Sequence, residues 1–352
     1  MADKSALQHL PNNGSTFVVK SGSHSSLIAR GLRDSLGLTP DAEFARGETY
    51  YNGDGVPQDY AEAAIWFRRA ADEGHAAAQN RLGCMYYAGE GVPKNFELSA
   101  HWIRKAADRG YGWAQNNLGS LYRDGEGVPR DGKQALFWFL KSAEQNNNDA
   151  KFQLALFFDH VGHKCEDVPF DVNQSTSWLL QAAESGDNRA QCLIADWYKS
   201  GHEVSYDITK AAYWYRKAAD QGDEEAQYEL ALLHRGGEGV QKDNEQAVFW
   251  FRKAAEQGHA NAQSELGWHY EASNGVRRSY TDAESWYRRA AEQGHAEAQH
   301  SLGLLFAKGK GVPQSYEEAQ AWFHKAADQG HEEARESLGL SYELWDASRM
   351  PW

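Results

Sequence analysis

Apolar residues along the chain fall on one face of predicted helices, and these helices occur in pairs. In the segment 78–113 the first helix has Ala78, Leu82 and Tyr86 at positions i, i+4 and i+8, which is the spacing of an amphipathic helix. The second helix has a similar stripe around its tryptophan, formed by Phe96, Ala100, Ile103, Ala106 and Ala107. Each stripe must be buried against a neighbouring helix. The pattern therefore predicts an all-α fold built from helix pairs.

The helix pair recurs along most of the chain, and tryptophan marks the recurrence. Eight tryptophans lie 36 residues apart, with one interval of 40, at positions 66, 102, 138, 178, 214, 250, 286 and 322. The units are 42–77, 78–113, 114–149, 150–189, 190–225, 226–261, 262–297 and 298–333, followed by a half unit at 334–345. The longer fourth unit has its extra residues between His160 and Asp167. Such a period predicts a solenoid of stacked repeats and argues against two separate globular domains.

Glycine and proline mark the ends of the helices. Between the two helices of a unit, the sequence Gly-x-Gly-Val-Pro occurs at 53–57, 89–93, 125–129 and 309–313. Its first glycine can adopt the left-handed conformation that ends a helix, and its proline cannot continue one. The second helix ends at another recurring glycine, and the third unit has Asn146 there. Since asparagine also tolerates a positive φ, this substitution agrees with a helix end at that position.

Small residues indicate how closely the helices approach one another. The first helix of several units carries Leu-Gly or Leu-Ala, as in Leu82-Gly83 and Leu118-Gly119. Glycine inside a helix costs about 1 kcal/mol relative to alanine, so its repetition implies close contact between helices. The tryptophan and the aromatic residue beside it are expected to fill the space between units. Burying each such side chain contributes about 2–3 kcal/mol.

The combined pattern resembles the Sel-one-like repeat (SLR), a relative of the tetratricopeptide repeat. The matching residues are Ala-Gln-x-x-Leu-Gly-x-x-Tyr, Gly-x-Gly-Val-Pro and Ala-x-x-Trp-Phe-x-Lys-Ala-Ala-x-Gln-Gly-His, and they extend over 42–345. The resemblance implies a right-handed α-α solenoid of about eight 36-residue two-helix repeats plus a C-terminal half repeat, with the first helices lining a concave groove. Residues 1–41 are expected to form a leader with a capping helix, and 346–352 a C-terminal tail.

Composition narrows the classes of partner. The chain has 36 Lys and Arg against 50 Asp and Glu, a net charge of −14, which argues against binding to duplex nucleic acid or to anionic membranes. No apolar run approaches the roughly 18 residues that a membrane helix requires. The N-terminal stretch lacks the apolar core of a signal peptide, and Cys84, Cys165 and Cys192 are too few for a disulfide framework. We therefore expect a cytoplasmic protein without membrane insertion.

The sequence offers little that would support catalysis or hold a cofactor. It lacks His-Glu-x-x-His, Cys-x-x-Cys, Gly-x-Ser-x-Gly and a phosphate-binding loop. Four histidines follow the glycine that ends the second helix, at 75, 259, 295 and 331; this fixed position indicates a role at the helix end, and we expect no metal shared among them. In the insertion, His160, His163 and Cys165 are ligand types that a loop could close around zinc. A plain surface insertion is the alternative.

The first helices also present a face that varies among the repeats and suits a partner. Positions equivalent to 80, 84 and 87 are spaced i, i+4 and i+7 and share this face. Its candidate partner-binding residues are Asn80, Asn116, Arg123, Lys199, Tyr228, Arg235 and Trp268. The basic residues are candidate clamps for a carboxylate, the asparagines for an extended backbone, and the aromatic residues are candidate anchors. Alternatively, the aromatic side chains pack between neighbouring first helices and the charges are only solvated.

These features favour a non-catalytic scaffold or adaptor that binds another protein or a peptide in the groove. The alternative is an immunity or inhibitory protein whose acidic surface neutralises a basic effector. The resemblance also raises an enzyme, since some secreted SLR proteins bind or hydrolyse β-lactams. Those relatives have two cysteines per repeat, whereas Cys84, Cys165 and Cys192 do not recur with the period. The enzyme is therefore the least supported of the three functions.

Overall fold

The computed structural model describes residues 39–159 and 168–339. Within these ranges the chain forms the sixteen helices labelled α2 to α17, a further helical segment at 332–339, and no strand. The chain divides into two compact units, Met1–Arg109 and Gly110–Trp352, and each is described by itself. Residues 1–38 of the predicted leader, the insertion residues His160, His163 and Cys165, and the C-terminal tail lie outside the described residues.

Both units are built from helix pairs that follow one another along the chain. The first unit contains α2 (Pro40–Asn52), α3 (Tyr60–Asp72), α4 (Ala76–Ala88) and α5 (Phe96–Asp108). The second contains α6 (Gly112–Asp124), α7 (Gly132–Ala143), α8 (Asn148–Phe158), α9 (Val172–Glu184), α10 (Asn188–Ser200), α11 (Ile208–Asp220), α12 (Glu224–Gly236), α13 (Asn244–Gln257), α14 (Ala260–Ala272), α15 (Tyr280–Glu292), α16 (Ala296–Lys308) and α17 (Tyr316–Asp328). Residues 332–339 are also helical.

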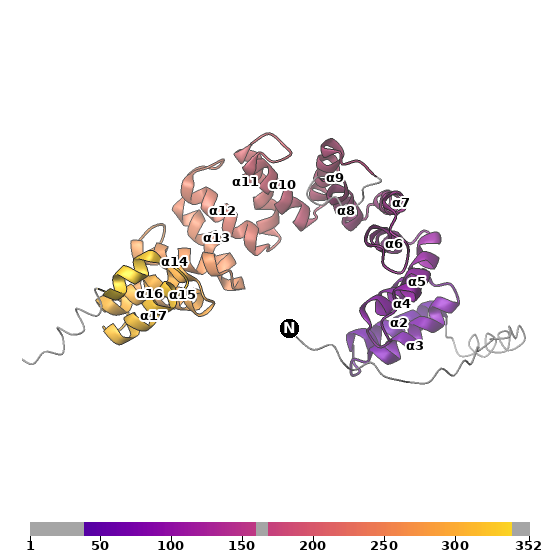
Figure 1. The fold of residues 1–352 in the computed structure, drawn as a ribbon, viewed down its shortest axis with the longest axis horizontal. Helices are drawn as coiled ribbons and strands as arrows, with labels where there is room; N and C mark the ends of the chain where they lie inside the picture. The colour runs from indigo at the N-terminus through magenta and orange to yellow at the C-terminus, as the bar shows by residue number, and fades with distance from the viewer. Residues whose placement is uncertain (1–38, 160–167, 340–352) are drawn as a thin grey trace, which may run out of the picture. The chain divides into compact units, whose positions relative to one another are not determined.

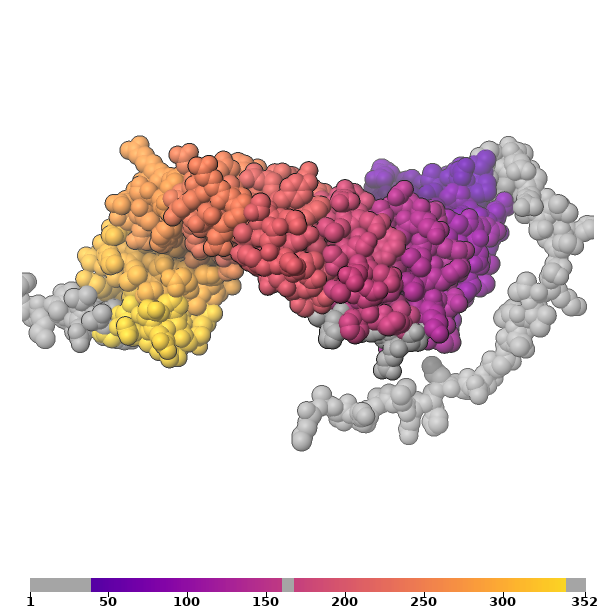
Figure 2. Space-filling view, turned by 90° about the horizontal axis from the view of Figure 1, so that it is seen from above, coloured from indigo at the N-terminus to yellow at the C-terminus, as the bar shows by residue number. Residues whose placement is uncertain are grey.

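Within each unit, every helix packs mainly against the helices before and after it in sequence, as can be followed in Figure 1. In the space-filling view the colour of the second unit changes gradually from magenta to yellow, so sequence neighbours are also spatial neighbours (Figure 2). This arrangement confirms the predicted all-α solenoid of two-helix repeats. The even-numbered helices are the first helices of the repeats, and the odd-numbered helices are the second.

The helix ends follow the predicted turn chemistry. Gly53, Gly89 and Gly309 end α2, α4 and α16 in the left-handed conformation, with φ of 80°, 81° and 61°. Asn146, which replaces glycine after α7, has a φ of 60°, so the interpretation of this residue is confirmed. In the seventh repeat Ser273 ends α14 with a φ of 61°.

The second glycine of the Gly-x-Gly-Val-Pro turn has a separate role that the pattern did not reveal. Gly91 has a φ of 66°, and a Cβ atom there would lie 2.2 Å from the carbonyl carbon and oxygen of Tyr60. Gly311 is placed in the same way, 2.5 Å from the carbonyl of Tyr280. The turn of one repeat therefore rests directly on the start of the second helix of the preceding repeat.

In each repeat, the residue that follows the periodic tryptophan has a large side chain that is buried in the core. These residues are at most 2% exposed: Phe67, Ile103, Phe139, Leu179, Tyr215, Phe251, Tyr287 and Phe323. Five of the eight periodic tryptophans are also buried, whereas Trp66, Trp178 and Trp286 are half-buried. A Cβ on Gly83 would lie 2.5 Å from Ile103, and one on Gly303 would lie 2.5 Å from Phe323. The predicted close approach of the two helices is confirmed.

A buried glutamine joins successive second helices. Gln263 of α14 is 4% exposed, and its side-chain amide donates to the backbone carbonyl of Ala255 in α13, 3.0 Å away. Its side-chain oxygen accepts a hydrogen bond from Gln293 after α15, at 2.8 Å. The same two bonds recur at Gln191, Gln227 and Gln299. The glutamine of the Ala-Gln motif therefore satisfies a carbonyl at a helix end and connects two repeats.

Replacing Gln263 by alanine is expected to lower the free energy of unfolding by about 1–3 kcal/mol, because two hydrogen bonds of about 0.5–1.5 kcal/mol each are lost. Among the described residues, the carbonyl of Ala255 then keeps only the N–H of Gly258 as a donor. Gln293→Ala is the matched control, since it removes the same glutamine–glutamine bond from an exposed position and leaves the bond to Ala255 intact. Urea denaturation of the two variants measures the difference. Equal losses would show that the bond to the carbonyl contributes nothing.

Candidate partner-binding cleft

Three successive first helices of the second unit line one cleft. The helices are α12, α14 and α16, and the cleft has a volume of about 480 Å³. Its walls are formed by Tyr228, Arg235, Asn261, Ser264, Glu265, Trp268, Tyr287, His295, Glu297 and Ser301. Three of the predicted partner-binding residues, Tyr228, Arg235 and Trp268, therefore lie in the same cleft.

The periodicity of the helices explains why these side chains reach the cleft. Tyr228 and Arg235 are seven residues apart on α12 and lie on one face. Ala226 and Leu230 of the same helix are fully buried and hold the rest of α12 against the core. Tyr228 and Arg235 are therefore positioned by a packed helix rather than by a loop.

Trp268 is the prominent apolar side chain of the cleft. It is 44% exposed, and its ring meets the ring of His269 edge-on, with the centroids 5.0 Å apart. The alternative that Trp268 packs between neighbouring first helices does not agree with this exposure. A large aromatic surface beside hydrogen-bonding groups is typical of an interface anchor.

Each of the predicted basic residues bonds to the next first helix. Arg235 forms an ion pair with Glu265, and the ammonium nitrogen of Lys199 lies 2.5 Å from a carboxylate oxygen of Glu229. Arg123 in turn bonds to Gln153 and to its neighbour Asp124. The three cations therefore already have partners within the protein. Because partly exposed ion pairs contribute only about 0–1 kcal/mol, a carboxylate of another protein could replace Glu265 at little cost.

The four histidines that follow the glycine begin the next first helix. His75, His259 and His295 are the N-cap residues of α4, α14 and α16, and Nδ1 of each accepts a hydrogen bond from a backbone N–H of the first turn. His331 does the same with Ala334. The expected structural role is thus a capping role. An accepting Nδ1 also requires that Nε2 carries the proton of the neutral ring.

In three of these four places, Nε2 of the histidine meets a carboxylate located 34 residues earlier. The pairs are His75 with Asp41, His259 with Glu225, and His331 with Glu297, at 3.2, 3.1 and 2.8 Å. The fourth position, for His295, is occupied by Asn261, and Nε2 of His295 makes no hydrogen bond to any described residue. Burial lowers the pKa of His295, so the ring is neutral and presents an N–H to the cleft.

Tyr228 adds another donor. Its ring stacks on His259, with the ring centroids 4.6 Å apart. Burial raises the pKa of Tyr228, and Glu265 and Glu229 add to this effect, so the hydroxyl stays protonated. The cleft therefore combines an aromatic anchor with several groups that donate hydrogen bonds.

The other predicted residues lie outside this cleft. Asn80 is half-buried in the first unit. Asn116 of α6 is 8% exposed and offers little surface to a partner. A second exposed tryptophan, Trp113, is 52% exposed and lines a separate hollow with Tyr111 and Asn148.

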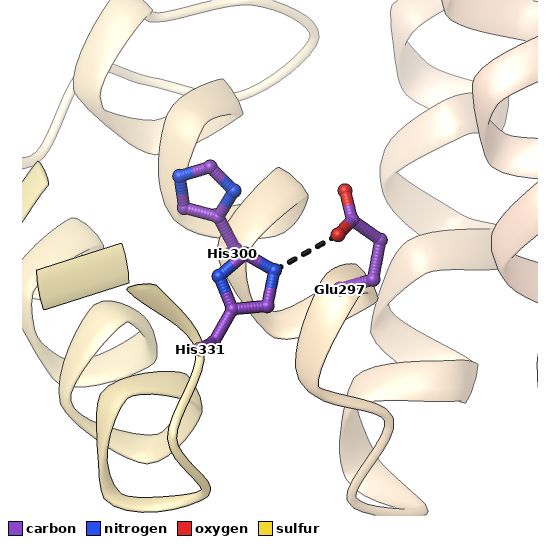
Figure 3. Close-up of side chains that lie close together, drawn as sticks. All are labelled: Glu297, His300 and His331. Atoms are coloured by element: carbon purple, nitrogen blue, oxygen red, sulfur yellow. Dashed lines mark hydrogen bonds and ion pairs between the residues drawn. The ribbon is translucent and has the colours of Figure 1, made fainter. Parts of the chain in front are cut away.

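Two groups of side chains have the composition of metal sites. Glu297, His300 and His331 have donor atoms within 4.8 Å of one another and converge as shown in Figure 3. Asp159, His202 and Glu203 form a similar group next to the insertion, whose residues 160–167 are outside the described structure.

Neither Cys84 nor Cys192 takes part in a disulfide. No helix among the described residues combines the length and the apolar character that crossing a bilayer requires.

Comparison with known proteins agrees with the repeats seen in the structure. The sequence model of one family, described as Sel1 repeat, matches residues 40–75, 76–111, 114–147, 149–187, 188–223, 224–259, 260–295 and 296–331. Among solved structures, the chain is similar to c5321, described as a protective antigen present in uropathogenic Escherichia coli strains that displays an SLR fold. The identity is 33%, the alignment covers 90% of this chain and 67% of that one, and the TM-score is 0.76.

A Sel1 repeat protein from Oxalobacter formigenes is also similar. It is 29% identical, the alignment covers 94% of this chain and 98% of that one, and the TM-score is 0.64. The comparison with curated proteins found no match.

Proposed function

Because this chain belongs to the Sel1 repeat family, we propose that it is a scaffold that holds an extended segment of a partner protein in the cleft between α12, α14 and α16. Proteins of this family are generally protein-interaction scaffolds, and they bind other proteins. The observation that carries the proposal is the position of Trp268, which is 44% exposed in a cleft that also contains unused hydrogen-bond donors.

The donors indicate the chemistry of the bound segment. His295 presents an N–H without a partner among the described residues, and Tyr228 presents a protonated hydroxyl. An extended peptide offers a carbonyl at every residue, so it can accept from both groups. An acidic side chain of the partner would compete with Glu265 for Arg235. The proposed ligand is therefore an extended segment with one apolar side chain for Trp268 and at least one carboxylate.

The other functions have less support. The Sel1 repeat fold is typically a non-catalytic scaffold. Among the described residues, no hydrogen bond joins the cleft serines Ser264 and Ser301 to His295, as a nucleophile paired with a base would require. The immunity proteins among the structural matches are distant, with 20% identity and a TM-score of 0.36 for one of them. The immunity function is therefore not favoured.

Trp268→Ala is expected to weaken the binding of a cleft partner by about tenfold or more, because truncating an aromatic anchor removes most of its contact area. The matched control is Trp113→Ala, which removes an exposed tryptophan from the other hollow. Proteins captured from the source cells by the wild type and both variants identify the partner, and titration with the purified partner gives the affinities. A partner that binds all three chains equally would rule out the cleft as its site.

A further inference from the structure

Three potential metal ligands meet where the last described repeat joins the helical segment 332–339. Nε2 of His331 lies 2.8 Å from a carboxylate oxygen of Glu297, and the ring centroids of His300 and His331 are 4.9 Å apart. Glu297 and His300 belong to α16, and His331 approaches from the turn after α17 (Figure 3). We propose that these three side chains bind a divalent transition metal, zinc in particular.

The other repeats show that His300 is the unusual member of this group. In the first repeat Phe44 stacks on His75, and in the sixth repeat Tyr228 stacks on His259, each with centroids 4.6 Å apart. Both of those capping histidines also have a carboxylate partner. His300 occupies the place of the stacked ring but has a ligand nitrogen. In the first and sixth repeats the arrangement consists of a stacked ring, a capping histidine and a carboxylate. With His300 as the ring, all three side chains are potential metal ligands.

The donor set and its spacing suit zinc. Two imidazoles and a carboxylate form a common zinc ligand set, with a fourth position open for water or another group. Magnesium and calcium prefer oxygen ligands only. Zinc ligands at about 2.0–2.2 Å from the metal are roughly 3–3.5 Å apart in a tetrahedral site, so donors already within 4.8 Å need only a small side-chain rotation.

When His331 binds a metal through Nε2, its ring proton moves to Nδ1, where Glu333 can accept it. In the metal-free ring Nδ1 accepts from the backbone N–H of Ala334, at 3.3 Å, a longer distance than the 3.0 and 3.1 Å at His75 and His259. When Nε2 binds zinc, the proton must sit on Nδ1. A carboxylate oxygen of Glu333 lies 3.3 Å from this atom and can accept it as a hydrogen bond. A carboxylate behind a histidine ligand is a usual feature of zinc sites.

The ring of His300 has a similar supporting contact. Nε2 of His300 lies 3.0 Å from the hydroxyl oxygen of Ser337, so one nitrogen can bind that hydroxyl while the other faces the metal. Glu297 also lines the partner-binding cleft, which places the metal at the edge of that cleft. The inference does not depend on the proposed function, since it concerns the binding of zinc alone.

Calorimetric titration of the full chain with Zn²⁺ tests the proposal, with His300→Tyr as the matched variant because tyrosine fills this position at Tyr228. The wild type is expected to bind one zinc ion more than the variant, and its melting temperature is expected to rise more when zinc is added. The two chains should melt at similar temperatures without metal. Glu297→Gln is expected to weaken the same site by about tenfold or more. Identical titrations of the wild type and His300→Tyr would overturn the proposal.

X-ray absorption of the wild-type zinc complex provides a test that does not require the variant to fold. At one equivalent of zinc, the expected spectrum is that of two imidazole nitrogens and a carboxylate oxygen at about 2.0–2.2 Å. A spectrum without two imidazoles would show that zinc binds elsewhere in the chain and would overturn the site.

Discussion

The Phe251→Ala variant is expected to lose about 3–5 kcal/mol of its free energy of unfolding. The Phe251 side chain is fully buried and lies between two first helices. Its ring centroid is 5.9 Å from that of Tyr228 on α12 and 5.4 Å from that of His269 on α14. Truncation would leave a cavity at the junction of two repeats, and that cavity can close only if the helices move. Chemical denaturation followed by circular dichroism measures the loss.

Phe249→Ala provides a control within the same helix. Phe249 is the same residue type two positions earlier, but its side chain is 46% exposed, so its removal should change the free energy of unfolding by no more than about 0.5 kcal/mol. Similar losses for the two variants would contradict the assignment of the core to the residue after the tryptophan. Because Phe251 contacts Tyr228, the Phe251→Ala variant should also bind a cleft partner less tightly.

The Gly91→Ala variant is expected to be destabilised by about 2–5 kcal/mol, the sum of two contributions. Alanine in the left-handed region costs about 1–2 kcal/mol. In addition, its Cβ would lie 2.2 Å from the carbonyl group of Tyr60, which requires a backbone shift with a cost of about 1–3 kcal/mol. Denaturation gives the total loss, and hydrogen exchange of α3 and α4 locates it.

The first repeat contains a control for the steric contact between the new Cβ and the preceding repeat. Gly55 occupies the same turn position with a φ of 74°, but no atom lies within 4 Å of a Cβ built there. Gly55→Ala should therefore cost only the backbone term of about 1–2 kcal/mol. If Gly91→Ala were no more harmful than Gly55→Ala, the contact between the turn and the preceding repeat would have no energetic role.

The repeat and its turns could be predicted from the sequence because both depend on local chemistry. A spacing of 36 residues and a glycine that ends a helix are visible without tertiary information, and the φ of Asn146 agrees with them. The order of burial within a helix was harder to predict. Trp250 and Phe251 both fall in one broad apolar stripe, and periodicity does not say which of the two lies between the first helices. The conspicuous tryptophan proved to be the outer member of the pair.

The cleft was predictable only in part, for a similar reason. Helical spacing placed Tyr228 and Arg235 on one face, but the ion pair of Arg235 with Glu265 joins residues 30 positions apart. The unpaired N–H of His295 depends on Asn261, 34 residues earlier. The sequence did contain a sign that His295 differs from the other capping histidines. The residue 34 positions before the histidine is acidic in the other three cases (Asp41, Glu225 and Glu297), whereas it is Asn261 before His295. The meaning of this difference became clear only once the structure showed that these residues touch.

The glutamine bonds, the turn contacts and the histidine pairs have in common that each connects a repeat only to its immediate neighbour. A gene that duplicated one internal 36-codon segment would therefore encode a chain in which the new repeat can form these same kinds of contact with its two neighbours. Loss of one segment would likewise leave the flanking repeats able to join. Recombination can thus change the number of repeats in a protein of this family without requiring a new kind of contact between repeats. Residues such as Asn261 and His300, which differ from those at the same position in other repeats, give single repeats their individual chemistry.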